Sequence, residues 1–442
     1  MAFHIRILVL FLTGTSVLNC FAQDSIYARK VIDALCGKKF NGRGYYKDGA
    51  RKSAKYISKE MKYAGLKSIS PGYFQEYKFP INRILSDPQL EINGIKFIPG
   101  REFLVGADAP NSNVNAVFGK FAKVVWIRAS NVSDSQFQKS LNPHTLLNFR
   151  GNTQGLIYPM LYLIDTMPAN LERANSKFLH WLRENANTIT FHKDKITWSA
   201  SPQQSKVVSF DVILPKSADK IYSGIESVKW NVKSSMAFTH QVNVVGMIPG
   251  TSHRDSFIMV TAHYDHLGRM GKSSMFPGAN DNAAGVAMIL DLAKYYEKHP
   301  PKYSMVFIAF SGEEAGLIGS GFYSRNPLHP LMKTRFMLNC DLVGTGETGI
   351  TVVNGAVFQK EFRILDSINN ANRYLTKIDR RGKAANSDHY HFSELGIPAF
   401  FWYQGGPRTS YHDIWDVPET LSLYGYNNTI KLAVEFFTAL GN

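Results

Sequence analysis

Histidine and carboxylate side chains stand at the ends of apolar runs in the second half of the chain. The run SFIMVTAHYDHLG carries His263 and Asp265 near its end, and YSMVFIAFSGEE ends in Glu313 and Glu314. A Gly-rich connection with Asp281 at its centre lies between these two runs. Residues of these types are ligands for divalent metal ions, so the pattern predicts a metal-dependent site.

Two further candidates, Asp341 and His412, stand at the ends of later units of the same kind. Two histidines, two aspartates and one glutamate suit a pair of zinc ions roughly 3.5–4 Å apart. Carboxylates alone would also fit magnesium or manganese, but the two histidines favour zinc. The predicted function of such a pair is hydrolysis, in which the metals generate hydroxide and polarise a carbonyl group.

Local geometry assigns further roles. A strand projects residues i and i+2 to the same side, so Asp265 is placed to accept the free ring N–H of His263. Glu313 and Glu314 are neighbours at a strand-to-helix turn and should point in different directions, so one can bind metal while the other acts as a general base. Each motif alone has a plainer explanation, because a Glu pair also favours a helix N-terminus. Their occurrence together and in order points to the metal site.

The elements that must position these residues alternate between strand-like runs and amphipathic helices. That alternation predicts an α/β protein whose site lies at the carboxyl ends of its strands. Helices are expected over 24–36 and 49–64, and Asn93–Gly94 between alternating residues predicts a hairpin. The pattern becomes irregular from about 111 to 235. The expected organisation is a signal peptide over 1–22, the first part of the main domain over 23–110, an inserted module over 111–235, and the rest of the main domain over 236–442.

Composition limits the partners and the compartment. The 442 residues carry a formal net charge of +15, but the basic residues are dispersed and no nucleic-acid-binding motif is present, so we expect no nucleic-acid partner. A basic start, a 12-residue apolar core and small residues before Gln23 are typical of a cleaved export signal. Cleavage there is favoured over lipid attachment at Cys20, and no later segment is apolar enough to span the membrane. Cys36 and Cys340 are expected to be buried free thiols.

Several motifs in this order resemble peptidase family M28, a family of zinc-dependent aminopeptidases. They are HYDHLG, GANDNAAGVA, FSGEEAGLIGS, NCDLVG, SDHYHF, GIPA and YHDIWD. The resemblance covers most of residues 240–442, and FNGRG with the helix after it is also similar to exported members. It implies a three-layer α/β/α sandwich with a mixed, mainly parallel sheet and a smaller mixed α/β module inserted into it. In many relatives the insertion is a protease-associated module, to which 111–235 shows no clear match.

The resemblance also implies a role for each site residue. Glu313 would be the general base, Asp265 would orient His263, and Asp388 and Tyr411 would contact substrate. A cis peptide bond is implied between Asp281 and Asn282. Two Zn²⁺ per chain would be held with Asp281 as the bridge: His263 and Asp341 would complete one site, and Glu314 and His412 the other.

The expected function is therefore that of an exported dinuclear zinc peptidase, which removes residues from the free N-terminus of peptides through a metal-bound hydroxide. Three alternatives stay open. A carboxypeptidase would need a cation for the terminal carboxylate of the substrate, and Arg380, Arg381 and Arg408 are candidates. A glutaminyl-cyclase-like transferase of the same clan typically uses one zinc. A non-catalytic binding protein on this scaffold would be expected to lose ligands or the base.

Overall fold

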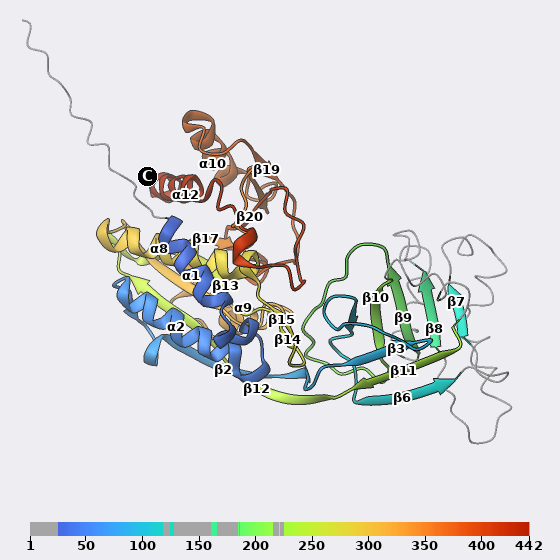
Figure 1. Cartoon of the computed structure of the whole chain (residues 1–442). Helices are drawn as coiled ribbons and strands as arrows, with labels where there is room; N and C mark the ends of the chain where they lie inside the picture. Colours follow the sequence, from blue (N-terminus) through green and yellow to red (C-terminus); the bar gives the residue numbers. More distant parts are fainter. Residues whose placement is uncertain are drawn as a thin grey trace, which may run out of the picture.

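Two lobes joined by a long pair of antiparallel strands make up the chain in the computed structural model (Figure 1). The joining strands are β2 (Phe74–Ile84) and β12 (Ser234–Ile248). The structure describes residues 25–117, 124–127, 161–165, 184, 186–214, 221 and 225–441. The predicted signal peptide and Cys20 therefore lie outside the described residues.

A nine-stranded mixed sheet forms the centre of the larger lobe. Its four middle strands pair in parallel, and the strands outside them on either side pair with them in antiparallel fashion. This confirms the α/β class and the mixed sheet. The order across the sheet is β1 (Lys67–Ser68), β12, β16 (Tyr303–Phe310), β13 (His253–His263), β17 (Thr334–Cys340), β20 (Ala399–Gln404), β18 (Ile350–Val353) and β19 (Ile378–Arg380), with β2 also paired to β12.

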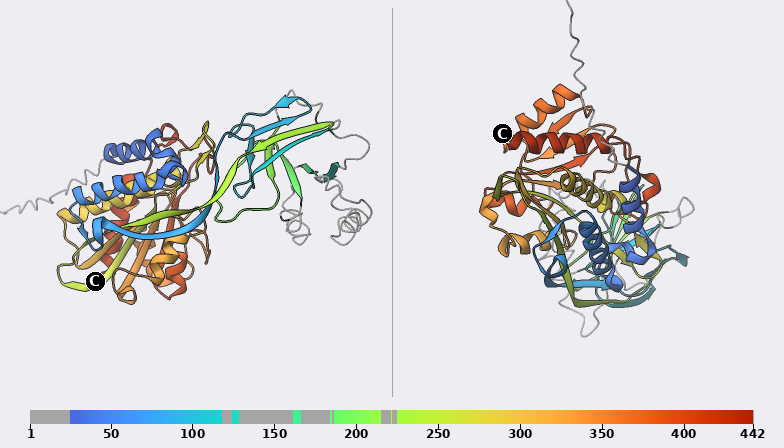
Figure 2. Two further views of the ribbon diagram at one scale, coloured as in Figure 1. Left: turned by 90° about the horizontal axis from the view of Figure 1, so that it is seen from below. Right: turned by 90° about the vertical axis from the view of Figure 1, so that its left-hand side faces the viewer.

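Helices cover both faces of this sheet, which gives the expected three layers (Figure 2). Along β16, Met305 and Phe307 pack on opposite sides from Val306 and Ile308, because successive strand residues point to opposite faces. The first face packs against α1 (Ser25–Cys36), α2 (Gly49–Tyr63), α8 (Ala284–Lys298), α10 (Gln359–Asn372) and α12 (Tyr426–Leu440). The second face packs against α9 (Ile318–Arg325) and α11 (Tyr390–Glu394).

Three parallel strands end at one edge of the sheet and deliver site residues there. β13 ends at His263, β16 ends shortly before Glu313, and β17 ends immediately before Asp341. The two-stranded ribbon β14 (Gly268–Met270) and β15 (Ser274–Phe276) follows β13 and leads into the segment that carries Asp281. The strand-end arrangement predicted from the sequence is therefore present.

The smaller lobe contains two sheets whose side chains share one apolar core. One sheet has the order β5 (Phe103–Val105), β10 (Ser209–Ile213), β9 (Asn187–His192), β8 (Leu161–Asp165) and β7 (Val124–Ile127). The other has the order β4 (Ile95–Lys96), β3 (Gln89–Ile92), β11 (Ser227–Val232) and β6 (Ser112–Val117).

Strands β3, β4 and β5 belong to the smaller lobe although they precede residue 111, where the inserted module was expected to begin. We propose instead that the module begins near residue 85, where β2 ends. Local sequence did predict the β3–β4 hairpin, in which Ile92 pairs with Ile95 across Asn93–Gly94. Both turn residues have positive φ, which the two-residue hairpin turn requires.

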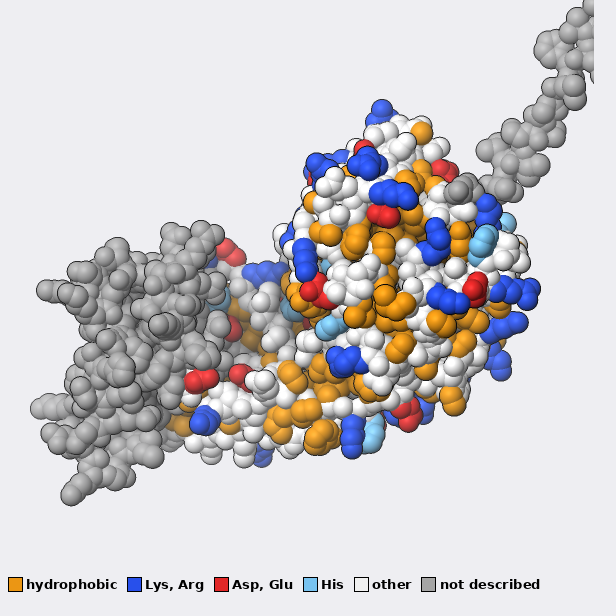
Figure 3. Space-filling model, turned by 180° about the vertical axis from the view of Figure 1, so that it is seen from behind, with side chains coloured by type: hydrophobic (Ala, Val, Ile, Leu, Met, Phe, Trp, Pro, Cys, Tyr) orange, Lys and Arg blue, Asp and Glu red, His pale blue; other side chains and the backbone are white. Residues whose placement is uncertain are grey.

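The burial of the two cysteines agrees with expectation. Cys36 and Cys340 are buried free thiols. Among the described residues, no helix has the length and apolar character needed to cross a membrane. Lysine and arginine side chains are spread over the face of the larger lobe shown in Figure 3 and do not form one block.

Candidate metal centre

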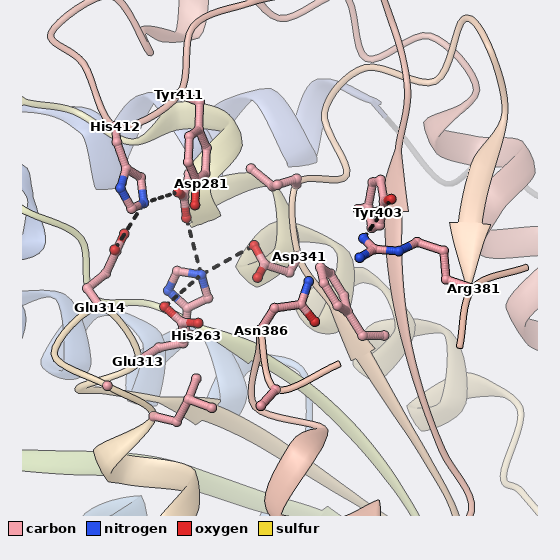
Figure 4. Close-up of a pocket in the computed structure, with 15 residues that line it drawn as sticks. His263, Asp281, Glu313, Glu314, Asp341, Arg381, Asn386, Tyr403, Tyr411 and His412 are labelled. Carbon is pink, nitrogen blue, oxygen red and sulfur yellow. Dashed lines mark hydrogen bonds and ion pairs between the residues drawn. The ribbon is translucent and has the colours of Figure 1, made fainter. Parts of the chain in front are cut away.

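Asp281 lies between two histidines, and each of its carboxylate oxygens faces a different one (Figure 4). Its Oδ1 lies 3.2 Å from Nε2 of His263, and its Oδ2 lies 3.1 Å from Nε2 of His412. Asp341 Oδ1 is 3.3 Å from His263 Nε2, and Glu314 Oε2 is 3.1 Å from His412 Nε2. The structure therefore brings the five candidate ligands together as two groups that share one carboxylate.

These separations fit metal coordination. Zinc–nitrogen and zinc–oxygen bonds of about 2.0–2.1 Å in a tetrahedral arrangement place neighbouring donor atoms about 3.3 Å apart. The four donor–donor distances of 3.1–3.3 Å match this value. Imidazole nitrogen and carboxylate oxygen are also the donor types that zinc prefers. The residues present therefore fit a pair of divalent cations.

The buried charges of this cluster also fit bound divalent cations. Burial alone would lower the pKa of His412, but Glu314 and Asp281 raise it to about 11. Burial alone would raise the pKa of Asp281, but hydrogen bonds from His263 and His412 hold it well below its usual value. Both pKa shifts have the same cause, the closeness of the imidazole rings to buried carboxylates. Bound divalent cations would offset the charge of these carboxylates.

Glu313 lies beside the two groups, and its carboxylate also forms a possible metal-binding cluster with His263 and Asp341. Its Oε2 lies 4.0 Å from His263 Nε2, farther than the carboxylates of Asp281 and Asp341. No hydrogen bond to its carboxylate is present among the described residues, and its side chain is 13% exposed toward the cavity. Burial raises the pKa of Glu313 well above its usual value, and the neighbouring carboxylates act in the same direction.

A chain of three buried polar residues orients Asp341. Thr261 Oγ donates to the side-chain oxygen of Asn339 at 2.8 Å, which directs the amide nitrogen of Asn339 toward Ser387 Oγ, also at 2.8 Å. Ser387 therefore has its own proton free to donate to Asp341 Oδ2 at 2.8 Å. Oδ1 of Asp341 is left to face His263. The direction of each hydrogen bond fixes which oxygen of Asp341 is available to a metal.

His266 performs the same task for Glu314, and sequence reasoning had given it no ligand role. Its Nδ1 lies 2.6 Å from Glu314 Oε1, so Oε2 is the oxygen left to face His412. His266 has no exposed surface. The HYDHLG motif contains it, but spacing alone could not show that its ring turns toward a glutamate 48 positions away.

The side chain of Asp265 supports the Glu313–Glu314 turn more directly than it supports His263. Its two carboxylate oxygens accept the backbone N–H groups of Glu313 and Glu314 at 3.2 and 3.3 Å. Tyr45 also donates to it, at 2.6 Å. The ring Nδ1 of His263 lies 3.1 Å from the backbone carbonyl of Asp265 but 3.9 Å from its carboxylate. The carbonyl, rather than the expected carboxylate, is thus the closer partner of the imidazole.

Arg43 holds the start of the Asp281 segment and was not identified as a site residue from the sequence. Its guanidinium has no exposed surface and donates to the carbonyl groups of Tyr264, Pro277 and Gly278 at 2.8, 2.6 and 2.6 Å. A longer hydrogen bond of 3.2 Å reaches the carbonyl of Asp281. One side chain therefore ties the end of β13 to the loop that carries the shared ligand.

Asp416 holds the same loop from the opposite side. Its carboxylate accepts the backbone N–H groups of Asn280 and Asp281 at 2.8 and 3.0 Å, and it forms an ion pair with Arg408 at 2.6 Å. The peptide bond between Asp281 and Asn282 is cis, as the family resemblance implied.

The smaller lobe supports the loop that carries His412. The backbone N–H of Trp198 donates to the carbonyl of His412 at 2.8 Å, and Lys195 lies 3.5 Å from the carboxylate of Asp413. Tyr411 stacks on the His412 ring with 3.9 Å between ring centroids. His412 itself has φ of +54°, a conformation that surrounding contacts must maintain in a residue other than glycine.

A cavity of about 450 Å³ opens beside the two ligand groups. Tyr411 lines it, as expected for a substrate contact. Asp388 is fully buried and does not line the cavity, so we do not propose it as a substrate contact. The lining residues are His263, Asp281, Glu313, Glu314, Gly316, Leu317, Asp341, Leu342, Arg381, Ala385, Asn386, Phe401, Tyr403, Tyr411 and His412.

Comparisons with known proteins show which proteins this part of the chain is similar to. Residues 243–437 match the model of peptidase family M28. Among curated proteins, a probable zinc metalloprotease of Leptosphaeria maculans is 34% identical over 130 residues, which cover 28% of this chain and 30% of that protein. Aminopeptidase YwaD of Bacillus subtilis is 30% identical over 191 residues, which cover 40% of this chain and 39% of that protein. The chain thus matches less than half the length of either relative.

Structural similarity extends farther along the chain. A solved zinc aminopeptidase from Bacillus subtilis superposes with a TM-score of 0.64 at 18% identity, over 93% of this chain and 94% of that one. At this identity the likeness concerns the fold, which is therefore shared over nearly the whole chain.

Arg43 provides the first test of how the site is built. Arg43→Ala leaves several buried carbonyl groups without donors, each costing about 1–3 kcal/mol, so we expect a loss of at least about 3 kcal/mol of stability. Thermal unfolding would show it as a midpoint lowered by several degrees. Arg51→Ala is the control, since Arg51 forms an exposed ion pair with Glu76 that contributes at most about 1 kcal/mol. Equal midpoints for the two variants would contradict the role given to Arg43.

Ser387→Ala tests the orientation of Asp341. Without the Ser387 hydroxyl, both oxygens of Asp341 are free to rotate, and we expect Zn²⁺ affinity to fall by about 10–100-fold. Competition with a chromophoric chelator measures this without reference to activity. Ser393→Ala is the matched control, because its hydroxyl bonds only to the carbonyl of Tyr390 within α11. Unchanged affinity in Ser387→Ala would show that Asp341 is oriented by other means.

Proposed function

We propose that the protein is a member of peptidase family M28, whose model matches residues 243–437, and that it is a zinc aminopeptidase that hydrolyses peptides at their free N-terminus. The single observation that carries the proposal is the position of Asp281, with one oxygen toward His263 and the other toward His412. Such a shared carboxylate supports two zinc ions. Asp341 would complete the group of His263, and Glu314 that of His412.

The proposed chemistry separates the roles of the metals and of the protein. Zinc, when bound, supplies Lewis acidity to the substrate carbonyl and to the attacking water. Glu313 faces the cavity, and its carboxylate accepts no hydrogen bond from the described residues. It is therefore placed to take a proton from that water. Glu313 then passes the proton to the leaving amine. Asp265 accepts the backbone N–H of Glu313 and so holds the turn that carries the Glu313 carboxylate.

The carboxylates of the cavity also favour a free amino terminus. Of the carboxylates that line the cavity, only Glu313 would stay free of metal, and its charge would attract a peptide ammonium group and repel a terminal carboxylate. The N-terminus of a peptide, rather than its C-terminus, is therefore favoured at the metal-binding end of the cavity, which is the arrangement of an aminopeptidase. A glutaminyl-cyclase-like enzyme with a single zinc would use one of the two ligand groups and leave the other without a function.

Export is part of the proposal. It rests on the basic start and apolar core of residues 1–22, which resemble a cleaved signal peptide.

The number of metal ions can be measured directly. We expect about two zinc ions per chain in the purified protein by elemental analysis. His412→Ala should retain about one, because His412 lies close only to the donors of the second group. A wild-type protein that binds a single zinc under saturating conditions would contradict the dinuclear assignment.

Glu313→Gln tests the catalytic assignment. We expect kcat to fall by about 10²–10⁴-fold, because the amide cannot accept the proton, while the zinc content stays that of the wild type. The assay compares peptides with free and acetylated N-termini, and only the former should be cleaved. Glu419→Gln, at an exposed position, serves as the matched control. Cleavage of acetylated peptides, or full activity in Glu313→Gln, would refute this mechanism.

A further inference from the structure

The cavity has two ends of opposite charge. One end carries the carboxylates and histidines of the candidate metal centre, and Figure 4 shows Arg381 and Tyr403 on the other side, across from His412 and Glu314. Arg381 is the only lysine or arginine among the residues that line the cavity. The guanidinium of Arg381, opposite a cluster of carboxylates, is placed to bind an anionic group.

Arg381 is held in place by neutral groups. Its Nη1 donates to the hydroxyl oxygen of Tyr403 at 3.1 Å, and its guanidinium lies 5.9 Å from the centre of the Tyr403 ring. Its backbone N–H donates to the carbonyl of Val352 at 2.8 Å, which anchors the segment to β18. In the part of the chain that the structure describes, no carboxylate forms an ion pair with Arg381. Its remaining donors are therefore available to a ligand.

The neighbouring arginines do not share this position. Arg408 is buried against Asp416 at 2.6 Å, where it supports the Asp281 loop. Arg380 lies over the ring of Phe362, 6.0 Å from its centre, and does not line the cavity. Of the three arginines that the sequence offered as anion ligands, only Arg381 faces the site.

We propose that Arg381 and Tyr403 bind a carboxylate group of the substrate, and this inference rests on the proposed peptidase function. Arginine presents several donors in one plane, which matches the two oxygens of a carboxylate. Tyr403 accepts a hydrogen bond from Arg381, so its own hydroxyl proton is directed away from the guanidinium and can be donated to the same carboxylate. Phe401 and Leu342 provide apolar surface in the cavity.

Two parts of a peptide could supply this carboxylate. One is the side chain of an N-terminal aspartate or glutamate. The other is the C-terminal carboxylate of a short peptide, which would make the enzyme selective for dipeptides. Both use the same interaction with Arg381, and substrates that differ in one carboxylate distinguish them.

The experiment compares wild-type enzyme and Arg381→Ala on two substrate pairs, each tested as holoenzyme. The first pair is Glu-Ala-amide against Gln-Ala-amide, and the second is Leu-Ala against Leu-Ala-amide. We expect the wild type to prefer the carboxylate-bearing member of at least one pair in kcat/KM, and Arg381→Ala to reduce that ratio by roughly ten- to a hundredfold. Arg381→Lys should restore part of the preference, since it keeps the charge but not the planar set of donors.

The control variant is Arg380→Ala, which removes the adjacent arginine outside the cavity and should keep both ratios at the wild-type value. A ratio that falls only for the Glu and Gln pair identifies an acidic N-terminal residue as the ligand, and one that falls only for the second pair identifies the C-terminus. Ratios that Arg381→Ala leaves unchanged would overturn the inference while leaving the peptidase function intact. A wild type that cleaves none of the four substrates would overturn the proposed function and, with it, this inference.

Discussion

Buried negative charge is the constraint on which the rest of the site depends. Asp281, Glu314 and Asp341 lie close to Glu313 and Asp265, with most of their side-chain surface buried beside the cavity. Like charges this close destabilise one another unless protons or cations offset them. Two histidines provide part of that compensation in the protein alone, and divalent cations would provide it fully. The site is therefore arranged so that folding and metal binding favour each other.

The same constraint explains why each donor is held by a different part of the chain. Carboxylates that repel one another stay in one geometry only if hydrogen bonds fix them individually. Ser387 does this for Asp341, and His266 does it for Glu314. The smaller lobe contributes as well, because the N–H of Trp198 supports the His412 loop. A function for that lobe in shaping the metal centre follows from this contact.

Sequence patterns predicted the framework well because period-two apolar runs and strand ends are local features. The hairpin at Asn93–Gly94 and the order of the strand-end ligands needed no knowledge of distant contacts. The features that the sequence did not predict depend on contacts between residues far apart in the chain. Arg43 meets carbonyl groups more than 200 positions away, and Asp265 turned out closer to the Glu313–Glu314 turn than to His263 through its carboxylate. The start of the inserted module that we propose near residue 85 has the same origin, since β3 pairs with β11 across more than 130 residues.

The separation of charge across the cavity orients any peptide that enters it. A peptide zwitterion carries an ammonium group at one end and a carboxylate at the other, and the cavity presents carboxylates opposite a single guanidinium. Charges in a partly enclosed cavity are screened less than in bulk water. A peptide bound in the reverse orientation would therefore be repelled at both of its ends. In the proposed function the ligand carboxylates are offset by bound cations, so Glu313 is the carboxylate left to attract the ammonium group. In the proposed function, discrimination between the two ends of a peptide would follow from the placement of Arg381 relative to Glu313 as well as from the shape of the cavity.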